Sequence, residues 1–246
     1  MTGPDVTAPA LAIEAVSYGY TAKTPVLHDI EFTVEGGVVG ILGNNGAGKS
    51  TLLKLAAGLM APSRGRVRVL GVDIAREPLK ARRSTAFLPE SLTLDGMLTP
   101  REFLHFVADL RGLPDPAAKI EHLLERLGGA PHADSLFREI SFGMRRKVGV
   151  ASAFLTGAPL VVLDEPGNGL DVASLTAVEA LIGEHAASGG VVLMSSHDMA
   201  FVARSCSTVR VIAAGREVAR GTPDELVRAA SATDLHQAFQ SLASAT

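Results

Sequence analysis

The stretch GVVGILGNNGAGKSTLLKLAAGL, residues 37–59, indicates the fold of the chain through three consecutive signals. Its first six residues are apolar or glycine and predict a short buried strand, and KSTLLKLAAGL predicts a helix that ends at Gly58. Between them, GNNGAGKS (residues 43–50) matches the complete phosphate-loop pattern. A strand, a glycine-rich loop and a helix in this order predict the α/β fold of a P-loop NTPase core.

Each residue type in this loop has a chemical reason. The glycines let backbone N–H groups turn towards phosphate oxygens, and the helix presents its positive end to the same anion. Lys49 can reach the β- and γ-phosphates, and Ser50 can bind Mg²⁺. A glycine-rich turn that matches by accident is the weaker alternative, because strand and helix flank the loop as required. The predicted nucleotide-binding residues of the loop are Gly43, Asn44, Asn45, Gly46, Ala47, Gly48, Lys49, Ser50 and Thr51.

Composition restricts the classes of protein that need consideration. The chain has 246 residues, which suits one domain with a smaller subdomain. Its net charge of −3 gives no basic field, so we expect no nucleic-acid partner. The single cysteine, Cys206, excludes an internal disulfide and a cysteine-rich zinc site, and suits a reducing cytosol. Residues 1–10 lack Lys, Arg and any apolar run, so we expect a disordered tail and no secretory signal.

Beyond the phosphate loop, further strands are expected on both sides. Residues 11–34 alternate loosely and predict an N-terminal antiparallel β-subdomain of edge strands. The apolar runs LVVLD (160–164) and GVVLMSS (190–196) predict strands covered on both faces, as in a mainly parallel sheet. We expect one nucleotide-binding domain over residues 11–222, followed by a helical tail over residues 223–246.

Residues 91–158 change character and predict a helical subdomain inserted into the α/β core. Thr-Pro-Arg-Glu at residues 99–102 forms a capping box with proline at the first helical position. A second helix should begin after Asp115 and Pro116 and end at Gly128. The apolar face of the first helix is expected to consist of Phe103, Phe106, Val107 and Leu110.

Two adjacent carboxylates, Asp164 and Glu165, stand where the LVVLD strand ends. Because side chains alternate along a strand, the two should point different ways and divide the chemistry. Asp164 can hold Mg²⁺ through its water shell, and Glu165 can orient and polarise an attacking water. A solvated acidic strand end is the alternative, and the phosphate loop upstream favours the catalytic interpretation. His197 follows another apolar strand, whose end should lie near the phosphates.

In their order along the chain, these motifs resemble one family, the ATP-binding-cassette (ABC) ATPases. The resemblance runs from about Leu11 to Gly221. It rests on an aromatic residue near the start, the phosphate loop, FLPE (87–90), ISFGMRRKV (140–148), LVVLDEP (160–166), GNGLD (167–171) and SSHD (195–198). The resemblance implies that the nucleotide is ATP and that Mg²⁺ accompanies it.

The resemblance also implies a role for each matching residue. Tyr20 would stack on adenine, with Tyr18 as the nearby alternative. Glu90 stands where the family usually has a Gln that senses Mg²⁺ and the attacking water, which implies a further metal ligand there. Asp171 matches a loop that bridges two nucleotide sites, and His197 would hydrogen-bond the γ-phosphate.

The stretch ISFGMRRKV resembles the family signature, which is usually Leu-Ser-Gly-Gly-Gln. Ser141 and Gly143 keep the pattern, whereas Phe142 replaces the first Gly and Met144 replaces the Gln. In the family this motif closes over ATP held by a second subunit, so that two ATP molecules lie between two head-to-tail chains. Ser141 would donate its hydroxyl to that phosphate, and the helix beginning there would point its N-terminus at it.

The resemblance therefore implies the ATP-binding subunit of an ABC transporter, most similar to bacterial exporters of drugs, antibiotics or lipids. The longest weakly apolar run, residues 148–163, is short for a membrane span and contains Pro159, so a separate permease chain would be the partner. A groove near Glu90 would receive a short helix of that permease. We expect a homodimer of cassettes, on the cytoplasmic face of the cell membrane.

One alternative comes from another functional class. Soluble ABC ATPases of assembly machines, such as the iron–sulfur type, are also single cassettes of about this size. Their signature usually keeps Gly-Gly followed by Glu, unlike the Ser-Phe-Gly-Met found at residues 141–144.

Overall fold

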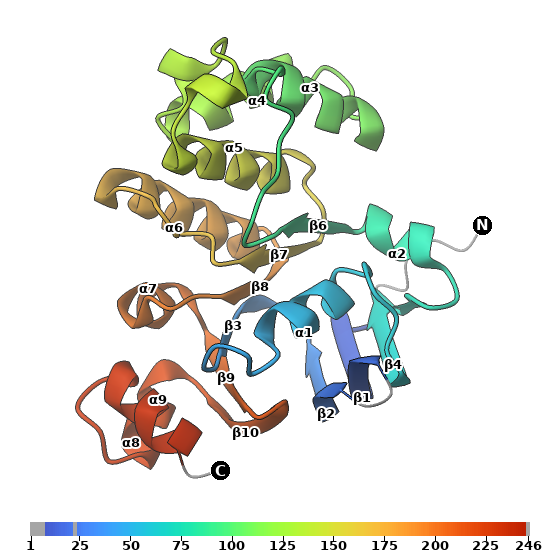
Figure 1. Cartoon of the computed structure of the whole chain (residues 1–246), viewed down its shortest axis with the longest axis vertical. Coiled ribbons are helices and arrows are strands. Elements are labelled where there is room, and N and C mark those ends of the chain that lie inside the picture. The colour runs from blue at the N-terminus through green and yellow to red at the C-terminus, as the bar shows by residue number, and fades with distance from the viewer. Residues whose placement is uncertain (1–7, 22–23, 245–246) are drawn as a thin grey trace.

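The computed structural model describes residues 8–21 and 24–244, and its strands form two sheets (Figure 1). The tail expected over residues 1–10 lies mostly outside the described residues. Ala10, however, is buried, and its carbonyl accepts a hydrogen bond from the N–H of Leu70. Ala10 therefore belongs to the packed structure.

The larger sheet carries the phosphate loop and has the strand order β10-β9-β3-β8-β7-β6. Its strands are β3 (Gly37–Leu42), β6 (Thr85–Leu88), β7 (Leu160–Asp164), β8 (Val191–Ser195), β9 (Thr208–Ala213) and β10 (Arg216–Gly221). Only β10 and β9 pair antiparallel within it, so the prediction of a mainly parallel sheet is confirmed. Val38 and Leu42 face one apolar core, whereas Val39 and Ile41 face another. Burial of both faces explains why this strand reads as an unbroken apolar run.

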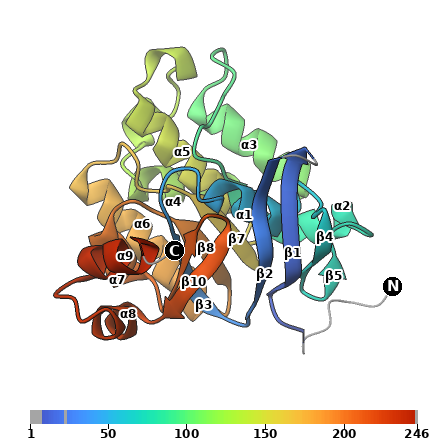
Figure 2. The ribbon, with the colours of Figure 1, turned by 60° about the horizontal axis from the view of Figure 1, so that its bottom comes forward.

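The smaller sheet is antiparallel throughout and has the order β2-β1-β4-β5, which confirms the predicted N-terminal β-subdomain. Its strands are β1 (Leu11–Thr21), β2 (Thr24–Val34), β4 (Arg64–Val69) and β5 (Val72–Asp73). Helix α1 (Lys49–Ala56) lies between the two sheets and contacts both (Figure 2). One apolar core therefore joins this sheet, α1 and one face of the larger sheet.

The helical subdomain stands at one end of the molecule, above α6 in Figure 1. It comprises α3 (Pro100–Arg111), α4 (Ala117–Arg126), the short 3-10 helices η1 (Ala130–His132) and η2 (Phe137–Glu139), and α5 (Phe142–Leu155). The predicted capping box is present, because Thr99 and Glu102 exchange side-chain to backbone hydrogen bonds. Pro116 precedes α4 as expected, and Ile120, Leu123 and Leu124 of α4 are buried.

The expected apolar face of α3 is wrong for two residues. Phe106 is 54% exposed and Leu110 is 70% exposed, whereas Leu104 and Ala108 are buried. The buried positions lie four residues apart and face α5 and α4, so the packing of neighbouring helices decides which stripe turns inward. Phe106 and Leu110 are left as apolar side chains on the surface.

The remaining helices are α2 (Pro78–Arg83), α6 (Val172–Ala187), α7 (Met199–Ser205), α8 (Pro223–Ala229) and α9 (Leu235–Ser244). Helices α8 and α9 fall within the expected helical tail and pack against each other and against β9 and β10. In the part of the chain that the structure describes, no helix is both long enough and apolar enough to cross a membrane.

Candidate nucleotide-binding site

The phosphate loop leaves β3 and enters α1 through a backbone that only small residues permit. Gly46 and Gly48 have φ values of 82° and 102°, in the left-handed region that glycine adopts without strain. A Cβ atom added to Gly43 would lie 2.5 Å from the carbonyl oxygen of Ile212. These glycines therefore let the loop curl closely against β9 before the helix begins.

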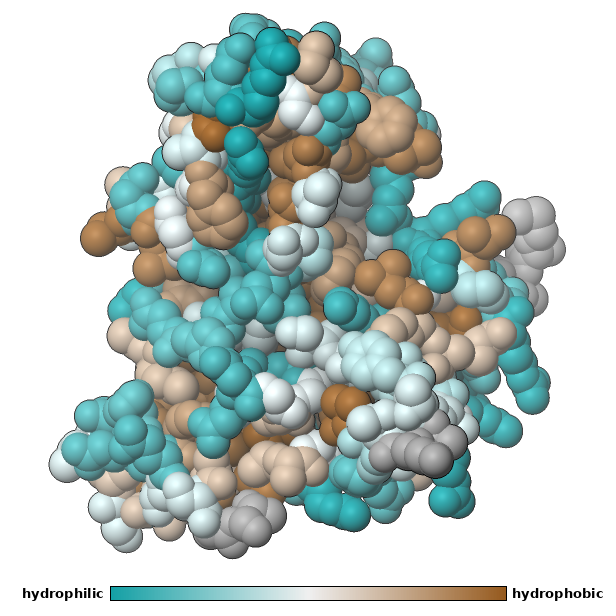
Figure 3. Space-filling model, viewed as in Figure 1, coloured by the Kyte–Doolittle hydropathy of each residue, from teal (hydrophilic) through white to brown (hydrophobic). Residues whose placement is uncertain are grey.

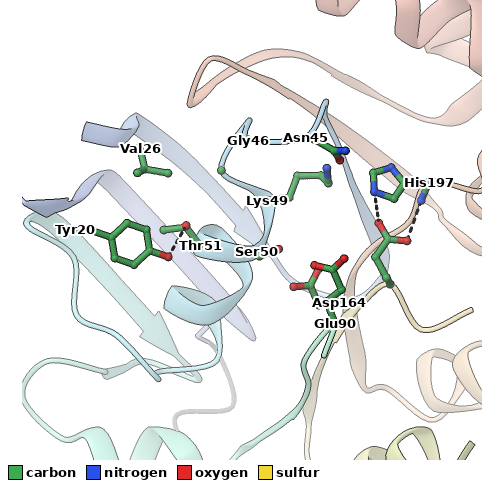
Figure 4. A pocket seen from close by; sticks show the side chains of 12 residues that line it. Tyr20, Val26, Asn45, Gly46, Lys49, Ser50, Thr51, Glu90, Asp164 and His197 are labelled. Atoms are coloured by element: carbon green, nitrogen blue, oxygen red, sulfur yellow. Dashed lines mark hydrogen bonds and ion pairs between the residues drawn. The ribbon is translucent and has the colours of Figure 1, made fainter. Parts of the chain in front are cut away.

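A cavity of about 510 Å³ opens in front of this loop (Figure 4). Most of the predicted site residues line it, although they come from distant parts of the sequence. The lining residues are Tyr20, Val26, Asn45, Gly46, Gly48, Lys49, Ser50, Thr51, Glu90, Asp164, Glu165 and His197. Gly43 and Asn44 instead line a neighbouring hollow with Asn45, His197, Met199 and Phe239, and Ala47 is buried.

Lys49 is the cation at the base of the cavity. Its Nζ donates hydrogen bonds to the carbonyls of Gly43 at 2.6 Å and Asn44 at 3.3 Å. Burial lowers the pKa of Lys49, while the nearby carboxylates of Glu165 and Asp164 act in the opposite direction. The loop therefore holds an ammonium group beside several carboxylates, in a place where phosphate oxygens can replace the carbonyls as its acceptors.

Asp164 ends β7 beside Ser195, the last residue of β8. The hydroxyl of Ser195 donates to Oδ1 of Asp164 at 2.6 Å and also accepts from the N–H of Glu165 at 3.1 Å. The two carboxylates face different partners, as expected, but strand alternation is not the cause. The strand stops at Asp164, and Glu165 turns away because its backbone is left-handed, with a φ of 54°.

Glu165 contacts His197 directly on one side of the cavity. One carboxylate oxygen accepts from the N–H of His197 at 3.0 Å, and the other lies 3.2 Å from its Nε2 (Figure 4). Burial raises the pKa of Glu165, and the proximity of His197 and Lys49 partly offsets this. A buried carboxylate with a raised pKa suits a group that attracts a proton from water.

Tyr20 forms the opposite wall of the cavity. Its ring is 59% exposed, and its hydroxyl lies 3.2 Å from Oγ1 of Thr51, which fixes the ring beside the phosphate loop. Tyr18, the alternative, does not line the cavity; it packs against the core and meets Tyr20 edge-on. An accessible aromatic face thus stands where a base could stack.

The signature residues gather elsewhere on the surface. Ser141, Phe142, Gly143 and Met144 line a second cavity, together with Lys147, Gly169 and Asp171. Ser141 caps α5 by accepting a hydrogen bond from the N–H of Met144 at 3.2 Å. A Cβ on Gly143 would lie 2.5 Å from the carbonyl oxygen of Gly169, so glycine here permits contact with the GNGLD loop.

Phe142 lies against the same loop. A Cβ on Gly169 would be 2.8 Å from its ring carbons, and the ring is otherwise largely exposed. Lys147 adds an ion pair to Asp171, with Nζ 3.3 Å from Oδ2. The signature residues (141–144) and the GNGLD loop therefore form one continuous surface within the chain.

Sequence reasoning missed several residues of these surfaces. Ser195 belongs to the SSHD motif and Lys147 to the ISFGMRRKV motif, but only their long-range contacts give them a role. Val26 of β2 lines the nucleotide cavity, but nothing in its local sequence distinguishes it. Arg146 was also missed; it is buried behind the site and contacts the backbone of both acidic segments.

Comparison with known proteins agrees with this geometry. A family model described as ABC transporter matches residues 27–168. The ABC transporter ATP-binding protein NatA of Bacillus subtilis (strain 168) is 35% identical over 220 residues, covering 87% of this chain and 89% of that protein. The Nod factor export ATP-binding protein I of Ralstonia nicotianae is 32% identical over 229 residues, covering 92% of this chain and 71% of that protein.

Among solved structures, an ATP-binding subunit of an ABC transporter matches with a TM-score of 0.88 and 34% identity, covering 95% of this chain and 99% of that one. These similarities favour transport over the alternative of an assembly ATPase. The chain therefore belongs to the ABC transporter family and is an ATP-binding subunit that hydrolyses ATP to power transport.

Proposed function

We propose that this subunit works as a head-to-tail dimer, most simply with a second copy of itself, in which each signature closes over the ATP of the partner. The supporting observation is the separation of two surfaces. Residues around Lys49 line one cavity, whereas Ser141 to Met144 and Asp171 line another. Because the chain does not bring its own signature to its own phosphate loop, a complete site requires a second chain.

The hydrogen bonding of Ser141 suits it for this role. Its oxygen accepts from the N–H of Met144, which leaves the hydroxyl hydrogen free to donate to an incoming phosphate oxygen. The first N–H groups of α5 point the same way, and no acidic residue occupies the first turn of that helix. This end of α5 therefore offers a donor and a partial positive charge to an anion.

Within the nucleotide cavity, Glu165 is the group that orients and polarises the attacking water. Its burial raises its affinity for a proton, and the backbone N–H of His197 and the nearby imidazole ring of the same residue hold its carboxylate in place. His197 is more than half exposed and can turn towards a γ-phosphate. Lys49 neutralises charge on the β- and γ-phosphates.

Ser50, Glu90 and Asp164 suit Mg²⁺ as oxygen ligands, and Figure 4 shows their side chains converging on one side of the cavity. Among the described residues, no three His, Cys, Asp or Glu side chains form a cage that could hold a metal alone. This agrees with a site for Mg²⁺, which takes one or two carboxylates and completes its shell with water and phosphate. When bound, the ion would neutralise charge on the β- and γ-phosphate oxygens.

The membrane partner is a permease in a separate chain, and we place the subunit on the cytoplasmic face of the membrane, in an exporter. Apolar side chains gather over the helical subdomain on the face seen in Figure 3. Phe106 and Leu110 of α3 are exposed. Leu79 of α2 is likewise exposed. An apolar surface here suits a short helix of the permease. The similarity to a Nod factor export protein supports the direction of transport.

The dimer is tested with Glu165→Gln, which keeps the shape of the side chain but removes the negative charge. With ATP and Mg²⁺ the variant should elute from size-exclusion chromatography at twice the monomer mass, because ATP is bound and not hydrolysed. Without nucleotide it should elute as a monomer. A monomer under both conditions would contradict the head-to-tail proposal.

The control separates a signature contact from a general effect on α5. Adding Ser141→Ala to Glu165→Gln should abolish the ATP-dependent dimer, because the donor to the partner's phosphate is lost. Adding Ser152→Ala should leave it intact, because the Ser152 hydroxyl donates to the carbonyl of Gly149 inside the same helix. Equal behaviour of the two double variants would exclude the proposed role of Ser141.

A further inference from the structure

Arg146 is a buried cation on α5, five residues after Ser141. It is 2% exposed and has the largest volume among the fully buried side chains. Burial lowers its pKa to about 10, while the nearby carboxylates of Asp164, Glu165 and Glu90 act to raise it. Burying a guanidinium is costly unless its N–H groups are satisfied, so its partners indicate what it does.

Those partners are backbone carbonyls and not carboxylates. Nη1 donates to the carbonyls of Pro89 at 2.5 Å and Glu90 at 3.1 Å. Nη2 donates to the carbonyl of Glu165 at 2.5 Å and also to that of Asp164. One planar group thus joins the segment after β6 to the segment after β7.

Each joined segment carries an acidic residue that lines the nucleotide cavity. We infer that Arg146 is a positioning residue for ATP hydrolysis: its guanidinium sets the spacing between the Glu90 and Glu165 segments and links both to the helix that begins at Ser141. The inference rests on the proposed roles of these two carboxylates. It adds a residue that does not line the nucleotide cavity and acts through the backbone.

Glu165 needs such support because its own backbone is unfavourable. Its φ of 54° is uncommon for a residue with a side chain and persists only where neighbours hold it. Ser195 restrains the N–H of Glu165, and Arg146 restrains its carbonyl. Loss of the guanidinium contact frees one end of this residue and lets its carboxylate move.

The guanidinium of Arg146 also connects α5 with the two segments that carry Glu90 and Glu165. Any displacement of α5 that follows binding of a partner's phosphate at Ser141 would pass through Arg146 to the segments of Glu90 and Glu165, because its hydrogen bonds join them. The link is short, because a single side chain spans it. Arg146 therefore connects the signature surface, which we propose binds the partner's ATP, with the cavity that we propose binds the chain's own ATP.

The test compares Arg146→Lys and Arg146→Gln with Arg111→Lys. Arg111 is a matched control, because its guanidinium also donates to several backbone carbonyls, those of Arg82, Arg83 and Thr85, and does not line the nucleotide cavity. Lysine keeps the charge but cannot span four acceptors. For each variant, kcat, KM, the Kd for ATP and the melting temperature are measured on purified protein.

We expect both Arg146 variants to lose about 10- to 100-fold in kcat per ATP-binding site, as small displacements of catalytic groups do, with the Kd for ATP within about threefold of wild type. Arg111→Lys should lower the melting temperature comparably and leave kcat within about twofold.

Unchanged kcat in Arg146→Lys, or kcat and ATP affinity that fall together with stability, would overturn the inference. Failure of both Arg146 variants to fold would also overturn the inference, because the hydrogen bonds of Arg146 would then be needed for folding. Glu165→Gln tests the proposed role of Glu165 separately from the role of Arg146. If that variant hydrolyses ATP normally, the proposed role of Glu165 is wrong, whatever the Arg146 variants do.

Discussion

Glu165 combines three constraints at the scale of a single residue: burial, a left-handed backbone and contact with His197. Burial favours its neutral form and raises its pKa, whereas the proximity of His197 and Lys49 favours the charged form. The balance makes the carboxylate easier to protonate than an ordinary glutamate.

This balance predicts the acid side of the activity profile. As pH falls, Glu165 takes up a proton at a higher pH than an unperturbed glutamate, so kcat should decline with a midpoint above 4.5. The His197 ring favours the charged carboxylate and lowers the pKa of Glu165, so in His197→Gln the midpoint of the residual activity should move to still higher pH. The measurement is kcat against pH for both proteins. A midpoint that is unchanged or lower in the variant would contradict the assignment of this midpoint to Glu165.

At the scale of elements, the start of α5 and the GNGLD loop act as one packed unit. Gly143 permits this packing because it has no side chain: an added Cβ would lie 2.5 Å from the carbonyl oxygen of Gly169. The ring of Phe142 lies near Gly169, and Lys147 forms an ion pair with Asp171, so both add contacts to the loop. The surface offered to a partner depends on this packing as much as on Ser141.

Gly143→Ala should therefore separate the loop from α5 and reduce both ATPase activity and the ATP-dependent dimer about tenfold or more. ATP binding to the monomer should stay within about twofold, because the nucleotide cavity is separate. Gly183→Ala is the control: it lies in α6 with nothing within 4 Å of an added Cβ, and alanine there should stabilise the helix by up to about 1 kcal/mol. Equal losses in both variants would show that helix propensity, not loop contact, is responsible.

At the scale of the whole molecule, the surface over α3 is the place where we expect ATP hydrolysis to couple to a membrane chain. Phe106 and Leu110 are exposed although α3 turns other residues inward, so their apolar area is available to a partner. Burying both would contribute on the order of 3 kcal/mol to association.

Phe106→Ser with Leu110→Ser should consequently lose the permease in co-purification from membranes, while basal ATPase activity of the isolated subunit stays within about twofold. The control is His122→Ser with Glu125→Ser, two exposed positions of α4. Retention of the permease by the α3 variant would place the membrane contact elsewhere.

Local sequence patterns were sufficient for much of this picture. The phosphate loop, the apolar strands and the capped start of α3 each depend on residues close together in the chain, where periodicity and backbone preference act directly. The nucleotide-binding residues from Gly43 to Thr51 could be named for the same reason, because one loop and one helix end form the phosphate-binding surface. The antiparallel β-subdomain and the mainly parallel sheet followed from composition and alternation.

Tertiary structure decided what depends on distant segments. Whether Phe106 faces inward depends on where α4 and α5 pack, and helical periodicity alone allowed more than one stripe. The orientation of Glu165 depends on the position of the end of β7 beside Ser195. The hydrogen bonds of Arg146 depend on the ends of β6 and β7 lying together next to α5. The sequence by itself thus determined the fold class and the phosphate site, whereas only the folded chain decided how the carboxylates are held. Contacts between remote segments leave no periodic trace in a single sequence.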